Sequence, residues 1–135
     1  AEQYASLFPF PIYPMNYVSN EKELVDIYNA VDLYVTPSLQ DNLPNTIVEA
    51  MACGIPCVGF NVGGIPQMID HLHNGYVAEY QSAKDLANGI RWTLTEGEYD
   101  NLSEEACRKA LSSYSESIIS MRYIDIYNKI TGSHA

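Results

Sequence analysis

The sequence has 135 residues, which suits one domain with its own apolar core, and 17 acidic and 7 basic residues give it a formal net charge of −10. That charge disfavours nucleic acid and anionic membrane surfaces as partners, and no apolar run approaches the roughly 20 residues that span a bilayer. We therefore expect a soluble, cytoplasmic protein. The three cysteines are odd in number and fit no close-paired metal spacing, so we expect buried thiols, no disulfide framework and no metal site.

The chain opens without Met, and its first residues show no helix or hairpin pattern. We therefore interpret residues 1–135 as a piece of a longer polypeptide. Within it, residues 1–15 are expected to form an irregular lead-in, and residues 132–135 are a candidate tail.

After the lead-in, short runs rich in β-branched and aromatic residues alternate with helical patterns. These runs predict four parallel strands, near residues 16–19, 33–37, 56–60 and 76–79. The helical patterns predict helices over 20–31, 46–53, 66–73 and 83–94, then over 103–114 and 115–130. Such alternation predicts an α/β fold, in which an open parallel sheet carries helices on both faces and the chain ends in two C-terminal helices.

Several of the expected helix boundaries carry residues that favour them. Asn20 and Glu23 have the spacing of a capping box, and Ser82 is a favoured N-cap residue. Gly54 is expected to end one helix, and Pro66 to occupy the first turn of the next. The last helix has six apolar residues among seven at helical spacing, so it needs a surface on which to pack.

Two acids, Asp41 and Glu49, flank the start of the helix that follows the second expected strand. We expect Asp41 in the loop and Glu49 in the first helical turn, near the carboxyl ends of the strands, where open parallel sheets bind ligands. The free N–H groups of that turn, together with Gly63 and Gly64 in the next loop, suit a phosphate. The acids would repel phosphate and instead suit neutral hydroxyls, and hydroxyls beside phosphate describe a nucleotide sugar.

A purely structural interpretation of these residues stands beside this one. Thr46 and Glu49 have capping-box spacing, and the helix dipole alone would stabilise Glu49 by about 0.3–1 kcal/mol. The loop around Asp41 also fits ordinary turn chemistry. The residues alone leave both interpretations open.

A longer pattern favours the functional interpretation. AVDLYVTPS, followed by QDNLPNTIVEAMACGIPCVGFNVGGIPQMI and NGYVAEY, resembles the C-terminal, donor-binding half of retaining GT-B glycosyltransferases of the group 1, family 4 type. The resemblance runs from Asn16 to Thr95 and implies a Rossmann-like, nucleotide-sugar-binding domain. The motif of that family is Glu, seven residues, Glu. It implies that Glu49 holds the ribose hydroxyls and that Asp41, shorter than the usual Glu by one methylene, contacts the donor sugar.

The resemblance also implies donor contacts around these acids, in part through backbone amides along the sugar and the diphosphate. The expected donor-binding residues are Asn42, Leu43, Asn45, Thr46, Gly63 and Gly64. The donor is a substrate, and no cofactor is expected. No metal is expected either, because no third ligand is spaced to join His71 and His73, which we interpret as a surface helix end.

Two parts of the resembled family have no counterpart here: a basic pair that clamps the diphosphate and an acceptor-binding N-terminal domain. We therefore expect this stretch alone to transfer no sugar. Its expected partners are a nucleotide sugar and the N-terminal domain of the same polypeptide, with membrane association only through absent regions or a lipid-linked acceptor. The expected function is retaining transfer to a hydroxyl in bacterial glycan or polysaccharide synthesis. The alternatives are a non-catalytic nucleotide-sugar module, or an epimerase or phosphorylase of the same fold.

Overall fold

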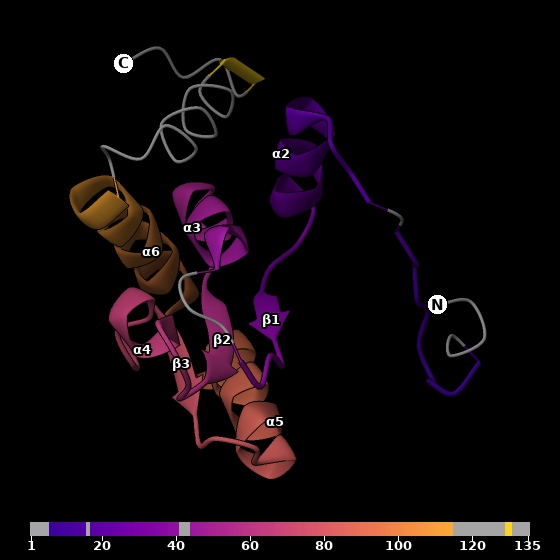
Figure 1. The fold of residues 1–135 in the computed structure, drawn as a ribbon, viewed down its shortest axis with the longest axis vertical. Helices are drawn as coiled ribbons and strands as arrows, with labels where there is room; N and C mark the ends of the chain where they lie inside the picture. The colour runs from indigo at the N-terminus through magenta and orange to yellow at the C-terminus, as the bar shows by residue number, and fades with distance from the viewer. Residues whose placement is uncertain (1–5, 16, 41–43, 115–128, 131–135) are drawn as a thin grey trace.

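The computed structural model describes residues 6–15, 17–40, 44–114 and 129–130. Strands and helices alternate through most of this length, as Figure 1 shows. The helices are α2 (Glu21–Asn29), α3 (Asn45–Ala52), α4 (Ile65–Met68), α5 (Ala83–Arg91) and α6 (Tyr99–Tyr114), with a π-helical turn, η1 (Trp92–Glu96), directly after α5.

Three strands form one parallel sheet. They are β1 (Tyr34–Thr36), β2 (Cys57–Phe60) and β3 (Gly75–Ala78), and they lie side by side in that order. In the register of the sheet, Val58 of β2 lies opposite Tyr76 of β3. The predicted α/β fold with an open parallel sheet is confirmed.

Helices cover both faces of the sheet. A Cβ built on Gly59 would lie 3.1 Å from Ile65 of α4, whereas a Cβ built on Gly89 of α5 would lie 2.4 Å from the ring of Tyr76. Gly59 pairs with Val77, the neighbour of Tyr76, and successive residues of a strand point to opposite faces. Therefore α4 packs on one face of the sheet and α5 on the other, as the sequence predicts.

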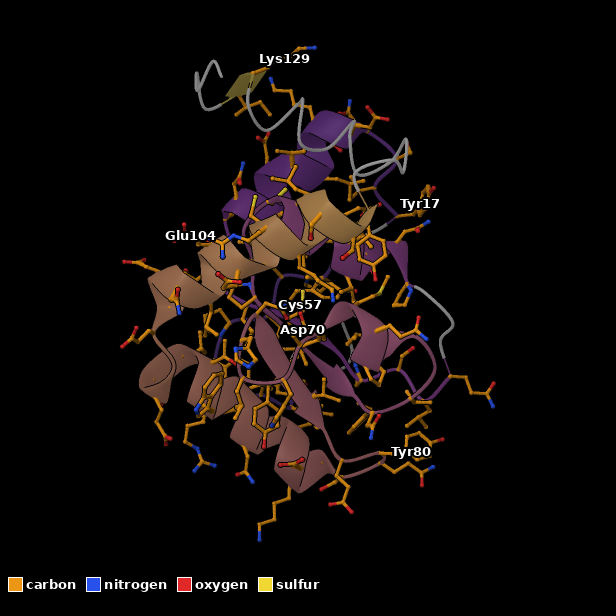
Figure 2. The ribbon with its side chains drawn as sticks, turned by 90° about the vertical axis from the view of Figure 1, so that its left-hand side faces the viewer. Tyr17, Cys57, Asp70, Tyr80, Glu104 and Lys129 are labelled. Atoms are coloured by element: carbon orange, nitrogen blue, oxygen red, sulfur yellow. The ribbon has the colours of Figure 1, made fainter. Side chains whose placement is uncertain are left out.

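The main apolar core lies between the sheet and the helices α2, α3, α4 and α6. Here α6 lies beside α3 (Figure 1), and the hydroxyl of Ser103 donates to the carbonyl of Gly54 at 2.6 Å. In Figure 2, Cys57 lies in the middle of the fold and Tyr17 at its periphery. The largest fully buried side chains include Ile47, Met51, Ile65, Met68, Ile69 and Val25.

The strand predicted near 16–19 is wrong for residues 17–19, which form no strand. Tyr17 is 93% exposed, and this segment runs outside the sheet toward α2 (Figure 1). A β-branched or aromatic run becomes a strand only when another strand pairs with it, and within the described residues this run has no such neighbour. Residues 6–15 also form neither helix nor strand.

The predicted N-caps of two helices are confirmed. The side-chain oxygen of Asn20 accepts from the backbone N–H groups of Lys22 and Glu23, at 2.9 and 3.2 Å. The hydroxyl of Ser82 accepts from the N–H of Asp85 at 3.1 Å. Each cap satisfies N–H groups that the first helical turn leaves without a partner.

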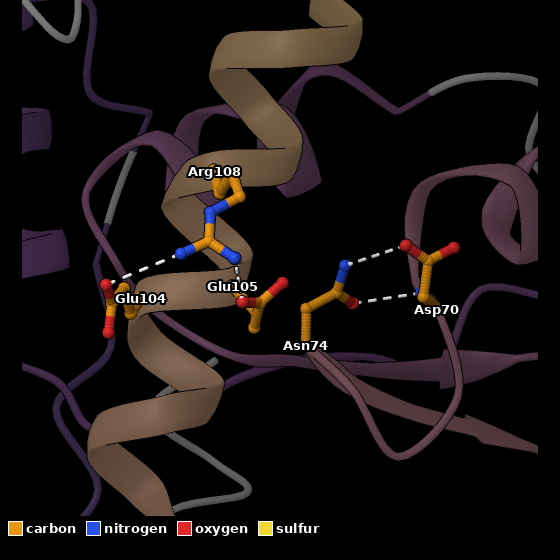
Figure 3. A network of polar contacts seen from close by, with 5 residues as sticks. All are labelled: Asp70, Asn74, Glu104, Glu105 and Arg108. Atoms are coloured by element: carbon orange, nitrogen blue, oxygen red, sulfur yellow. Dashed lines mark hydrogen bonds and ion pairs between the residues drawn. The ribbon is translucent and has the colours of Figure 1, made fainter.

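The helix predicted over 66–73 is shorter than expected, because α4 ends at Met68. The side-chain oxygen of Asn74 accepts from the N–H of Asp70 at 2.9 Å and so replaces a helical hydrogen bond, and Leu72 has a positive φ of 69°. Figure 3 shows Asn74 bonded to Asp70. These local side-chain bonds favour a turn over continued helix.

The loop after α4 follows the edge of β3 that faces away from β2. The N–H of Leu72 donates to the carbonyl of Gly75 at 2.8 Å, and the N–H of Val77 donates to Nδ1 of His71 at 3.0 Å. The interpretation of His71 as a helix end is therefore wrong. This imidazole satisfies a backbone N–H at the edge of the sheet.

The two C-terminal helices were expected over 103–114 and 115–130. The first is α6, which begins earlier than predicted, at Tyr99. Of the second, only residues 129–130 are described, and they are helical. The rest of that prediction lies outside the described residues. No helix in the described part of the chain is long and apolar enough to cross a membrane.

Candidate functional site

Glu49 is a buried acid at the junction of α3 and α2. It is the fifth residue of α3 and so lies in the second turn, which makes the predicted first-turn position wrong. The residue is 9% exposed. Its Oε2 accepts a hydrogen bond of 2.8 Å from the hydroxyl of Tyr28 in α2. The carboxylate is thus oriented by a neighbouring helix and not by the terminus of its own helix.

Burial dominates the electrostatics of this acid. Loss of hydration raises the pKa of Glu49, and the hydrogen bond from Tyr28 lowers that pKa by a smaller amount. The ion pairs that the structure gives within its described residues lie elsewhere, around Arg108 (Figure 3) and Lys109 of α6. An ionised Glu49 would therefore gain from any further hydrogen-bond donor that a ligand brings to it.

The capping-box interpretation of Thr46 and Glu49 is wrong. The N-cap of α3 is Pro44, whose side chain makes no capping hydrogen bond. The hydroxyl of Thr46 instead accepts from the hydroxyl of Tyr34 in β1, at 2.9 Å. A capping-box role for Glu49 is thus excluded, and the structural contact that remains is its hydrogen bond with Tyr28.

Four of the predicted donor-binding residues lie at one edge of the sheet. Asn45 and Thr46 are exposed at the start of α3. Gly63, with a φ of 57°, and Gly64, the N-cap of α4, follow β2. Because β1 and β2 are parallel neighbours, the loops that follow them leave the sheet at the same edge. Ligands bind at this carboxyl edge in open α/β sheets.

The remaining predicted site residues, Asp41, Asn42 and Leu43, lie outside the described residues. Their placement relative to Glu49 therefore stays a prediction. The same holds for the expectation that both acids of the motif lie at the carboxyl edge of the sheet.

Tyr28 is a site residue that the sequence reasoning missed. The helical pattern assigns it to the apolar face of α2, and it is indeed 6% exposed. A buried tyrosine differs from a buried phenylalanine in needing a partner for its hydroxyl. A tyrosine at a position expected to be buried therefore indicated a buried hydrogen bond, although the sequence does not say which residue is the partner.

The described residues contain no group of three or more His, Cys, Asp or Glu side chains that could hold a metal ion. They do form an open groove of about 490 Å³ beside α4. Glu49 and α3 contribute nothing to that groove. Its lining residues are Asn61, Pro66, Ile69, Asp70, His71 and Val77.

A parallel sheet with helices on both faces defines a Rossmann-like α/β fold. The chain belongs to the family described as glycosyl transferases group 1, whose model matches residues 15–110. Its fold is that of part of a GT-B glycosyltransferase.

Among curated relatives, the N,N'-diacetylbacillosaminyl-diphospho-undecaprenol alpha-1,3-N-acetylgalactosaminyltransferase of Campylobacter jejuni is 30% identical over 117 residues, which are 86% of this chain and 31% of that protein. Among solved structures, sucrose-phosphate synthase from Thermosynechococcus elongatus has a TM-score of 0.66 at 24% identity, over 83% of this chain and 28% of that one. Anabaena HepE in complex with UDP-glucose has a TM-score of 0.63 at 23% identity, over 83% and 30%. This chain thus spans less than a third of each of these three proteins.

Proposed function

We propose that this chain is part of the donor-binding domain of a retaining glycosyltransferase, which transfers a sugar from a nucleotide diphosphate to a hydroxyl in glycan or polysaccharide synthesis. The observation that carries the proposal is Glu49, a buried carboxylate that accepts a hydrogen bond from the hydroxyl of Tyr28. Membership of the group 1 family supports transferase chemistry.

In this proposal Glu49 accepts hydrogen bonds from the ribose hydroxyls of the donor. A carboxylate can accept from two neighbouring hydroxyls, and such charge-assisted bonds are stronger where water is excluded. The exposed first turn of α3, at Asn45 and Thr46, offers backbone N–H groups to the diphosphate, and Gly63 and Gly64 allow its close approach.

The loop before α3 completes the proposed site. Asp41 contacts the donor sugar, and the backbone amides of Asn42 and Leu43 follow the sugar and the diphosphate. A cation for the leaving diphosphate must come from elsewhere, because the sequences 37–44 and 61–64 contain neither Lys nor Arg. Electrostatic stabilisation of this kind is usually the largest catalytic effect, so the chain alone is expected to transfer no sugar.

The relatives narrow the donor and the acceptor to be tested first. HepE was solved in complex with UDP-glucose, and the name of the Campylobacter relative includes a diphospho-undecaprenol acceptor. We therefore propose a UDP-sugar as the first donor class and a lipid-linked hydroxyl as the first acceptor class.

The test offers UDP-, GDP- and ADP-sugars to the full-length polypeptide, with the product detected by mass and its anomeric configuration read by NMR. Glu49→Gln should weaken UDP binding by about 10-fold or more, because hydrogen bonds to charged groups are worth about 1.5–3 kcal/mol. The matched control is Glu23→Gln, an exposed acid on α2. Unchanged UDP affinity in a folded Glu49→Gln variant would contradict the ribose role. An inverted product would contradict the retaining mechanism, and transfer by the 135-residue chain alone would contradict the need for an outside cation.

A further inference from the structure

We propose that Tyr28 is a positioning residue for the nucleotide, which holds one oxygen of Glu49 so that the other oxygen is presented to the ribose. The proposal rests on the proposed function, since it needs a ribose at Glu49. The geometry behind it is the 2.8 Å hydrogen bond from the hydroxyl of Tyr28 to Oε2. With Oε2 engaged from the α2 side, Oε1 becomes the oxygen for a ligand hydroxyl.

The donor of this hydrogen bond is itself held in place. Tyr28 is 6% exposed, and its ring meets the ring of Tyr34 at 6.4 Å between centroids and 68° between planes, an edge-to-face arrangement. Tyr34 in turn donates to the hydroxyl of Thr46. The two tyrosines therefore connect α3 to α2 and to β1, and the donor that orients the Glu49 carboxylate is held by a ring contact as well as by its own hydrogen bond.

The charge state of Glu49 depends on the same contact. Among the described residues, the hydroxyl of Tyr28 on α2 bonds to Glu49, and the thiol of Cys53, the C-cap of α3, lies within electrostatic reach of both Glu49 and Cys107 of α6. Burial raises the pKa of Glu49, and the Tyr28 hydrogen bond lowers it. Loss of the hydroxyl would therefore leave a carboxyl group that ionises at higher pH and that can rotate more freely.

A second explanation must be separated from this one, namely that Tyr28 only fastens α2 to α3. If Tyr28 only connects the two helices, Tyr28→Phe should change the affinity for every nucleotide equally and should mainly lower the free energy of unfolding. A positioning role would affect only nucleotides whose ribose carries hydroxyls. Uridine diphosphate and its 2′,3′-dideoxy analogue differ in these hydroxyls and share the base and the diphosphate, so they form a suitable pair of probes.

The experiment measures the binding of both probes to the full-length polypeptide by calorimetry, for wild type and Tyr28→Phe. The control is Tyr99→Phe, which removes a hydroxyl that donates to the carbonyl of Asp32 at 2.8 Å on another part of the fold. Tyr28→Phe should weaken UDP binding by about 3- to 10-fold, leave the dideoxy analogue unchanged, and move the acid limb of UDP binding to higher pH. Equal weakening for both probes would overturn the proposal.

A double-mutant cycle with Glu49→Gln separates the failure of this inference from the failure of the proposed function. If Tyr28 acts through Glu49, Tyr28→Phe should cause no further loss of UDP affinity in the Glu49→Gln background. Weakened UDP binding by Glu49→Gln with no effect of Tyr28→Phe would overturn only the role of Tyr28. No effect of Glu49→Gln would overturn both. Should Tyr28→Phe fail to fold, 3-fluorotyrosine at this position keeps the ring and alters the donor strength of the hydroxyl, and an unchanged UDP affinity would then count against the proposal.

Discussion

Gly89 of α5 lies against the ring of Tyr76 in β3, and Gly89→Ala tests how tightly these two elements pack. A Cβ here would lie 2.4 Å from Cδ1 and 2.8 Å from Cγ of Tyr76. Carbon atoms prefer separations of about 3.5–4 Å, so the new methyl group would overlap the ring by about 1 Å. The ring is held in place, because its hydroxyl donates to Asp85 at 2.7 Å and its centroid lies 6.2 Å from that of Trp92.

Two effects of Gly89→Ala oppose each other. Alanine favours a helix over glycine by about 0.5–1 kcal/mol, whereas overpacking of a well-packed site costs about 1–3 kcal/mol. We expect the cost of the overlap to exceed the gain in helix propensity, so that the free energy of unfolding falls by about 1–2 kcal/mol. Urea unfolding followed by circular dichroism measures this loss. The control is Ala87→Gly at an exposed position of the same helix, which isolates the helix propensity.

A Gly89→Ala variant more stable than wild type would refute this reasoning. The cause can be checked by adding Tyr76→Leu, which removes the ring. The loss caused by Gly89→Ala should then shrink or reverse in sign, because the methyl group has room and only the gain in helix propensity remains.

Three further predictions concern buried residues. Burial raises the pKa of Glu49 above its ordinary value of 4.5, so folding favours the protonated form of this carboxyl group. The stability that this preference contributes is fully present below pH 4.5 and is lost as the pH rises through the folded-state pKa. Urea titrations should therefore show Glu49→Gln gaining stability relative to wild type as the pH rises above 4.5. Burial raises the pKa of Cys53 to about 12, so mass spectrometry should detect its alkylation by iodoacetamide at neutral pH only after unfolding. Met51 is fully buried, and Met51→Ala should lower the free energy of unfolding by about 2–5 kcal/mol, whereas Met15→Ala, at a residue 62% exposed, should leave it nearly unchanged.

The periodicity of the sequence was enough to predict the layers of the fold, because alternating short apolar runs and helical stripes have few other ways to bury their apolar faces. It failed for residues 17–19, a run of the right composition that has no strand to pair with in the described part of the chain. Strand formation depends on a partner elsewhere in the chain, which a local pattern cannot supply. The early end of α4 was missed for a different reason, since the Asn74 side chain competes with the backbone for the N–H of Asp70.

The sequence predicted where some of the candidate residues lie, although their roles stay predictions. The start of α3 and the two glycines after β2 lie at the predicted edge of the sheet. The capping-box spacing of Thr46 and Glu49 was misleading, because the helix begins two residues earlier than that spacing requires and Thr46 bonds to Tyr34. The contact between Tyr28 and Glu49 joins residues 21 positions apart on two helices. Such a contact follows from the packing of whole elements and has no local signature.

An edge strand usually offers unpaired N–H and carbonyl groups to any strand that approaches it, from the same molecule or from another. On the outer edge of β3, the carbonyl of Gly75 and the N–H of Val77 are already bonded to Leu72 and His71. A second molecule could not pair with this edge unless it first displaced the loop, so association by strand addition is disfavoured there. Because the edge of β3 is covered, a further strand that widens the sheet has to join at the other edge, beside β1.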